Sequence, residues 1–433
     1  MTGIPRRAHR ATSLEHIFGS AHALEQAQQQ LTKMLTSRGI YFGEGLLPTY
    51  AFAYVTSKDR VKKWAEQAEL VIAAADHCAR EAVTESVTCD TQSFDNEVSE
   101  LIFAYPGYER CCVICRPDGI PNGDDLRFVE LNCDSPAMMM FLDIVTDCLL
   151  QLDAFQTLGQ EMRPAKPAAD ILLETLLECY REYGGKQTPT IAIADWEGQK
   201  TRFEHLRLAE HFERAGYPTV VCDPRAFRRV GGELQLLNGQ RVHIVYRRAL
   251  VSEIINRRHE LEPLLRAYRD GTVCMVNPLR AYVASAKSLM THLVERELPP
   301  WLKPAAKLVP RTVLMDDPQA RKEVMANPER FVLKKSEGHG GKHVLLPGVA
   351  TESAWREAME VSRREVWIAQ DYLEVPMMAM PVADGDRIAW SDRFYNWNPF
   401  VFGGRFAGGL VRTSSTPLIN ITLGGGLLPT LGK

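Results

Sequence analysis

The chain has 433 residues, of which 45% are hydrophobic and 24% charged, and its formal net charge is −3. These values are typical of a folded globular protein, and the length allows two or three domains. The nearly balanced charge gives no electrostatic basis for binding nucleic acid or an anionic membrane, and no apolar stretch approaches the roughly 18–20 residues of a membrane-spanning helix.

Helical periodicity of apolar residues comes first, over residues 12–38 and 58–85. Two strands are expected next, within residues 111–132, where apolar runs flank a stretch rich in turn formers. Helix-like apolar patterns then cover residues 137–152 and 171–183. This part of the chain therefore predicts helices that pack around a β-hairpin.

A different pattern begins near residue 188. Short apolar strands are expected at 190–194, 219–222 and 242–246, with a helix over 205–215 between the first two. Because strands that alternate with helices usually pair in parallel, this segment predicts a small parallel-sheet module.

After the strand at 242–246, a helix is expected over 281–294, and it carries Lys287. From residue 308 strands and short helices alternate, and glycine-rich strands follow at 399–425. We therefore predict a mixed α+β and α/β fold. Its expected divisions are an N-terminal helical region with the hairpin, the parallel-sheet module and a C-terminal part: residues 1–165, 166–295 and 296–433.

The hairpin carries polar side chains in a regular spacing. Glu130 and Asn132 are two apart on an apolar strand, so they point to the same face. Arg116 and Asp118 have the same spacing on the preceding strand. A hairpin brings the four onto one face, where two carboxylates need a cation and the arginine suits an anion. The pattern thus indicates a Mg²⁺–polyphosphate site, and the alternative is a core strand whose polar residues cap a turn.

One residue of the hairpin breaks a local rule. Pro117 cannot donate a hydrogen bond to a neighbouring strand, so we expect its strand to lie at a sheet edge or to be bulged there. Cys111, Cys112 and Cys115 lie in or beside the same apolar run and are interpreted as core thiols. Free thiols are usual in a reducing compartment, and no apolar run follows the N-terminal arginines, so we expect no signal peptide and a cytoplasmic protein.

A second chemical pattern is the segment 331–344. Apolar strands flank a loop that contains Gly338, Gly340 and Gly341, and Lys334 lies where the first strand ends. Glycine backbone N–H groups can surround an anion, and a lysine can neutralise its charge. The loop lacks the Gly-Lys-Ser/Thr sequence of a P-loop. The alternative interpretation is an ordinary hairpin with a glycine turn.

A third segment, Gln370 to Leu373, follows four apolar residues and is interpreted as a linker between two sheets. Such a linker can present backbone groups to a nucleotide base.

Together these segments resemble the ATP-grasp superfamily, in which two α+β halves hold ATP between their sheets. The Glu-x-Asn strand at Glu130 precedes the glycine loop at Lys334 here, whereas the usual order is the reverse. That order resembles the circularly permuted branch, which includes the synthetase half of glutathionylspermidine synthase-like proteins. The segments Gly408 to Arg412 and Val245 to Arg248 also resemble parts of this family. Lys335 departs from it, because the family usually has proline there.

The resemblance implies a role for each matching position. Asp118, Glu130 and Asn132 would bind Mg²⁺, and Arg116 would stabilise the transferring phosphoryl group. Arg412 would lie near the γ-phosphate or the substrate carboxylate. The expected nucleotide contacts from the lysines, the glycine loop and the linker are Lys287, Lys334, Gly340, Gly341, Lys342, Gln370, Asp371 and Leu373.

The resemblance further implies an ADP-forming carboxylate–amine ligase that uses ATP and Mg²⁺ and proceeds through an acyl-phosphate. The alternatives are an ATP-grasp phosphotransferase and a non-catalytic ATP-binding protein. Expected partners are a small carboxylate and a small amine, with amino acids, peptides and polyamines all open. The sequence leaves the oligomeric state undetermined.

Overall fold

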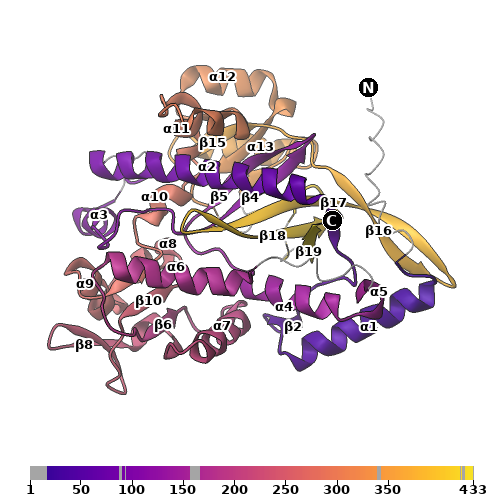
Figure 1. The fold of residues 1–433 in the computed structure, drawn as a ribbon. Coiled ribbons are helices and arrows are strands. Elements are labelled where there is room, and N and C mark those ends of the chain that lie inside the picture. Colours follow the sequence, from indigo (N-terminus) through magenta and orange to yellow (C-terminus); the bar gives the residue numbers. More distant parts are fainter. Residues whose placement is uncertain are drawn as a thin grey trace.

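The computed structural model describes residues 17–86, 90–92, 94–156, 166–338, 343–419, 421 and 425–432. A large mixed sheet lies at its centre and joins strands from both ends of the chain (Figure 1). Its order is β3 (Tyr54–Thr56), β19 (Gly426–Gly432), β18 (Arg405–Ser414), β17 (Arg387–Phe402), β4 (Ile114–Asn122) and β5 (Asp125–Asn132). A further strand, β16 (Met377–Asp384), pairs with β17.

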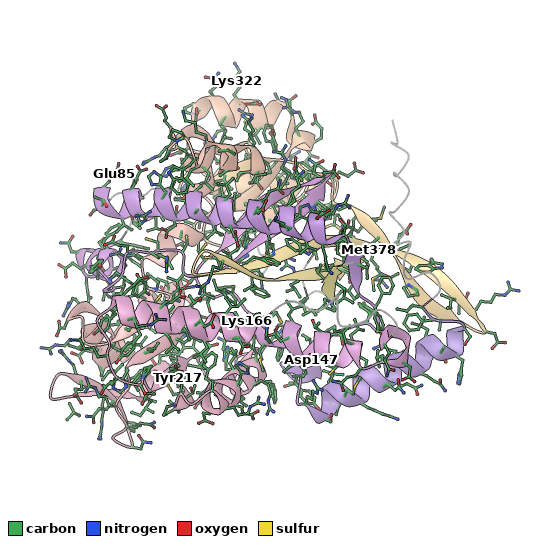
Figure 2. All side chains as sticks on the ribbon, viewed as in Figure 1. Glu85, Asp147, Lys166, Tyr217, Lys322 and Met378 are labelled. Carbon is green, nitrogen blue, oxygen red and sulfur yellow. The ribbon has the colours of Figure 1, made fainter. Side chains whose placement is uncertain are left out.

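Helices cover both faces of this sheet. The long α2 (Lys58–Glu85) packs against β5, β17 and β18, while α4 (Met139–Leu150) and α6 (Ala168–Glu182) pack on the opposite side (Figure 1). A hydroxyl of Ser57 caps the start of α2, and small buried residues such as Ala75 and Ala79 let the helix approach the sheet closely. Side chains fill the space between the helices and the sheet, and Figure 2 labels one residue in each covering layer, Asp147 on α4 and Glu85 at the outer end of α2.

The predicted parallel-sheet module is confirmed. It contains four parallel strands in the order β11 (Cys274–Val276), β10 (Ile244–Arg247), β6 (Ile191–Ala194) and β7 (Thr219–Cys222). The helix α7 (Arg202–Arg214) connects β6 to β7. The module is completed by α8 (Val251–Asn256), α9 (Glu262–Arg269) and the hairpin of β8 (Phe227–Val230) and β9 (Glu233–Leu236).

A smaller antiparallel sheet forms the third layer, with the order β12 (Thr312–Leu314), β15 (Trp367–Asp371), β13 (Phe331–Lys335) and β14 (Val344–Leu345). It carries α12 (Pro318–Ala326) and α13 (Glu352–Val361) and has its own apolar core around Met315 and Phe331. The first hundred or so residues of the chain also form α1 (Ala21–Ser37), the paired β1 (Tyr41–Phe42) and β2 (Gly45–Leu46), and α3 (Asn96–Phe103). After residue 308 the elements follow in the order β12, α12, β13, β14, α13 and β15, which confirms the predicted alternation of strands and short helices.

The expected helix over 281–294 is wrong in one respect that matters for the site. The chain forms two short helices, α10 (Ala281–Ser285) and α11 (Leu289–Glu295), and Lys287 lies between them. The backbone N–H of Lys287 donates to the Ser336 carbonyl (3.3 Å), and that of Ser288 donates to the Ser336 hydroxyl (3.0 Å). Bonds to a neighbouring segment therefore replace the hydrogen bonds that would continue the helix.

The expectation for Pro117 is met by a bulge rather than by an edge position. β4 lies between β17 and β5, and its pairing with β5 shifts register between Asp118 and Gly119. The division at residues 165 and 295 stays a prediction. Among the described residues we find no helix with the length and hydrophobicity needed to cross a bilayer.

A buried ion pair joins the parallel-sheet module to the end of β5. Arg247, in β10, donates from Nη1 to Asp134 Oδ1 at 2.5 Å, and both side chains are almost fully buried. The second oxygen of Asp134 accepts the N–H of Val251 at 3.0 Å. A buried pair is weak evidence for stability, yet removing one partner leaves an uncompensated charge.

We predict that Arg247→Ala lowers the free energy of unfolding by about 3–5 kcal/mol, because Asp134 is then buried without its cation. Chemical denaturation followed by circular dichroism measures this. Arg266→Ala is the matched control, since Arg266 forms pairs while its side chain is 56% exposed; its loss should cost under about 1 kcal/mol. Equal effects of the two changes would contradict the prediction.

Candidate functional site

A cleft of about 410 Å³ opens between the large sheet and the antiparallel sheet. Nine of the predicted site residues line it: Arg116, Asp118, Glu130, Asn132, Lys334, Gln370, Asp371, Leu373 and Arg412. Lys287 also reaches the site through its contact with Glu130. The predicted residues Gly340, Gly341 and Lys342 lie outside the described residues.

The two strands of the hairpin set the geometry of the acidic part. Asp118 lies opposite Glu130 in the β4–β5 register, and Arg116 lies opposite Asn132. The Asn132 amide donates to Asp118 Oδ1 at 3.2 Å. The predicted hairpin therefore brings two carboxylates and an amide together on the side of the sheet that faces the cleft.

A buried lysine balances Glu130. The Nζ of Lys287 lies 2.8 Å from Glu130 Oε1, and the lysine side chain is 3% exposed. The same Nζ donates to the carbonyl of Gly338, at the start of the glycine loop. Lys287 thus links the metal-binding candidate Glu130 to the described end of that loop.

Lys334 crosses from the small sheet to the large one. Its Nζ donates to the Val129 carbonyl and to Gln370 Oε1, each at 2.7 Å. Burial lowers the pKa of Lys334 to about 8, although the nearby carboxylate of Glu130 opposes this shift. Two neutral oxygens therefore hold the ammonium group in place without neutralising its charge.

Arg412 connects β18 to the acidic pair. Its Nη2 donates to Asp118 Oδ2 at 2.5 Å and to Asn398 Oδ1 at 3.2 Å, and Nε lies 3.4 Å from Asn396 Oδ1. Asn398 in turn donates to Asn396 at 2.9 Å. The two amides on β17 fix the guanidinium beside the carboxylate of Asp118.

Arg116 has capacity for a further acceptor. Its Nη1 donates to the Ala137 carbonyl at 2.9 Å, while its Nε is buried without a hydrogen-bond partner, 3.7 Å from Asp118 Oδ1. Burial lowers the pKa of Arg116 to about 10, which leaves the guanidinium charged at neutral pH. A buried cation with an unsatisfied donor is suited to hold an anion.

The predicted linker begins later than the sequence indicated. Gln370 and Asp371 belong to β15, where they pair with Val332 and Phe331, and the link to β16 starts at Tyr372. The apolar residues Trp367, Ile368 and Ala369 precede them in the same strand, as expected because β15 is an interior strand with a partner on each side. Asp371 Oδ1 is buried without a partner at this rim of the cleft.

At position 335 the departure from the family pattern has a structural counterpart. The backbone N–H of Lys335 donates to the His343 carbonyl at 3.2 Å, a bond that proline cannot make. The side chain pairs with Glu365 at 2.9 Å.

The charged groups around the hairpin fit a metal–polyphosphate complex. They comprise four cations and two carboxylates: Arg116, Lys287, Lys334, Arg412, Asp118 and Glu130. Carboxylate and amide oxygens are hard donors of the kind that Mg²⁺ accepts. The excess of cations over carboxylates suits phosphate oxygens whose charge a metal only partly neutralises.

Some contributors to the site were missed at the sequence level. Asn396 and Asn398 have the same i, i+2 spacing as Glu130 and Asn132, and that signal could have found them. Phe42 and Thr201 also line the cleft, but they come from a two-residue strand and a helix start. No local pattern marks such positions.

Comparison with known proteins identifies the fold. Residues 150–414 match the model of the family described as "Circularly permuted ATP-grasp type 2". Two sheets facing a cationic cleft define an ATP-grasp fold, and the chain belongs to the circularly permuted ATP-grasp type 2 family. The matched segment contains Lys287, Lys334 and Arg412, whereas the β4–β5 hairpin precedes it.

A solved structure with a TM-score above 0.5 supports the fold. A glutathione synthetase-like effector from Globodera pallida is similar over 98% of this chain and 100% of its own, with 12% identity and a TM-score of 0.62. A putative gamma-glutamylcysteine synthetase from Methylobacillus flagellatus KT is 13% identical over 73% of this chain and 80% of its own, with a TM-score of 0.44. The search of curated proteins gave no match.

We predict that ATP affinity falls as pH rises through the pKa of Lys334. With a pKa of about 8, the protonated fraction drops from about nine tenths at pH 7 to about one tenth at pH 9. The Kd for ATP should then rise about tenfold over this range. Titration of tryptophan fluorescence measures the Kd, and Lys334→Arg, which stays charged, should give a flat profile. A sloping profile in Lys334→Arg would assign the effect to another group.

Proposed function

We propose that this protein is an ATP-dependent carboxylate–amine ligase that forms an amide or peptide bond and releases ADP and phosphate. Family membership supports ATP-dependent ligation as the general activity. The observation that carries the proposal is the joint placement of Asp118, Glu130, Asn132 and two basic groups, Arg116 and Arg412, in one cleft. That set can hold a nucleotide polyphosphate and a carboxylate next to each other.

The nucleotide would lie along the antiparallel sheet. Lys287 and Lys334 offset phosphate charge, and the apolar side chains of Val332, Leu346 and Leu373 offer a surface for the base. Asp118, Glu130 and Asn132 would hold Mg²⁺, which when bound neutralises phosphate charge and orients the phosphates. Mg²⁺ would then share the carboxylate oxygens of Asp118 and Glu130 with Arg412 and Lys287, which contact them in this structure.

In the proposed first step a substrate carboxylate oxygen attacks the γ-phosphorus of ATP, and the bond to ADP breaks. Arg116 is suited to stabilise the charge on the transferring group, since its buried Nε has a free donor. In the second step the amine nitrogen attacks the acyl-phosphate carbon. Phosphate leaves, the nitrogen loses a proton, and an amide remains.

The main alternative is an ATP-grasp phosphotransferase, which gives a stable phosphorylated product and no amide. A non-catalytic ATP-binding protein is the second alternative. The presence of both carboxylates and all four cations favours catalysis, because ATP binding alone does not need a carboxylate pair beside the phosphates. The identities of the acid and the amine are to be found by experiment. Amino acids, small peptides and polyamines are all candidates.

We predict ADP release that requires Mg²⁺, a carboxylic acid and an amine together. A coupled assay for ADP over pairs of amino acids and polyamines, with products weighed by mass spectrometry, measures it. The expected product mass is the sum of acid and amine minus water. ADP formation with one acceptor and a phosphorylated product would instead establish the phosphotransferase, and nucleotide binding without turnover would establish the non-catalytic protein.

Glu130→Gln and Asp118→Asn are each predicted to abolish ADP formation while the protein stays folded, because each removes a charge from the metal site. Raising Mg²⁺ should partly restore the rate, since the remaining ligands still bind the ion weakly. The matched control is Asp124→Asn in the turn of the same hairpin, where the side chain is 80% exposed. Unchanged turnover in Glu130→Gln would remove the metal assignment.

A further inference from the structure

The lining of the cleft includes further apolar side chains that do not belong to the antiparallel sheet, along which the nucleotide would lie. This apolar region comes from three segments: β1, the loop before α4 and the segment after β18. The lining side chains are Phe42, Ala137, Met138, Leu418, Ile419 and Ile421. Thr201 adds one hydroxyl. Among the described residues, the ones that these three segments contribute to the lining carry no ionisable group.

This region begins directly beside Arg116, which would stabilise the transferring phosphoryl group and would therefore lie close to the carboxylate that receives it. Arg116 Nη1 donates to the carbonyl of Ala137 at 2.9 Å, which fixes the loop before α4 against the guanidinium. A carboxylate that receives the phosphoryl group beside Arg116 would therefore direct the rest of its molecule along Ala137 and Met138.

Met138 is held in its place by a buried carboxylate. Its backbone φ angle is 88°, a left-handed conformation that residues other than glycine rarely adopt. Glu204, in α7, accepts the N–H of Met138 at 2.9 Å and that of Met140 at 3.1 Å, and Glu204 is fully buried. Backbone strain maintained by surrounding bonds is common at ligand sites.

Phe42 is fixed from the same module. The N–H of Gly43 donates to the Lys200 carbonyl at 2.9 Å, and the Tyr41 ring lies 5.3 Å from that of Phe203. The ammonium of Lys200 lies 5.9 Å from the centre of the Phe42 ring, but Lys200 does not line the cleft. These contacts fix Phe42 in the apolar wall that the lining side chains form beyond Arg116.

We propose that the acid substrate carries one carboxylate on an uncharged, mainly apolar body, which packs against Met138, Phe42 and Ile419. This inference rests on the proposed ligase function and names the substrate class of its carboxylate site. A second charge on the acid would be buried against this wall without a partner, which is unfavourable. Acids of the glutamate type, with an additional ammonium and carboxylate group, are thereby disfavoured.

The experiment measures binding of 4-methylpentanoate and of glutarate by calorimetry, with a non-hydrolysable ATP analogue and Mg²⁺ present. We expect 4-methylpentanoate to bind at least about tenfold more tightly than glutarate. In Ile419→Asp its affinity should fall about tenfold, while that of the ATP analogue stays within about twofold. Leu237→Asp is the control: Leu237 is 68% exposed and does not line the cleft, so both affinities should be unchanged.

Three outcomes would overturn the inference: glutarate binds as tightly as 4-methylpentanoate, neither acid binds, or Ile419→Asp leaves binding unchanged. The ADP-release screen, with 4-methylpentanoate added to its acids, separates this result from the proposed function. If no acid–amine pair releases ADP while 4-methylpentanoate binding still depends on Ile419, the ligase proposal fails and the apolar acid site stands.

Discussion

The position of Asp118 directly opposite Glu130 is the constraint on which the rest of the site depends. Two carboxylates that lie opposite each other on paired strands repel each other unless cations lie within a few ångströms. Lys287, between α10 and α11, pairs with Glu130, and Arg412, in β18, pairs with Asp118. Arg116 offsets part of this repulsion within the hairpin, and the rest is relieved when the segment between α10 and α11 and the strand β18 have reached their final positions.

The acidic part of the site could be predicted because its geometry is local. Side chains two apart on a strand share a face, so the spacing of Glu130 and Asn132 was enough to place them together. The roles of Lys287 and Arg412 were found by resemblance to a family, and their contacts could not be derived. Arg412 meets Asp118 across the sheet from a distant part of the sequence, and no local pattern records such a pairing.

The errors follow from the same distinction between local and distant interactions. Apolar periodicity predicted one helix over 281–294, yet the backbone and hydroxyl of Ser336 take the hydrogen bonds that this helix needs. Gln370 was assigned to a linker because polar residues follow an apolar run there. Its side chain is in fact an interior acceptor for Lys334 and a donor to Thr312, so a buried network accounts for its polarity.

The large sheet is completed by β19, which pairs with β18 on one side and in parallel with β3 on the other. During synthesis the β4–β5 hairpin emerges long before its neighbour β17, and β3 long before β19. Until then these strands have unpaired edges, which are sites of aggregation in incomplete chains. The permuted order therefore places a demand on biosynthesis: the early strands need protection on the ribosome until the last described strand has been made.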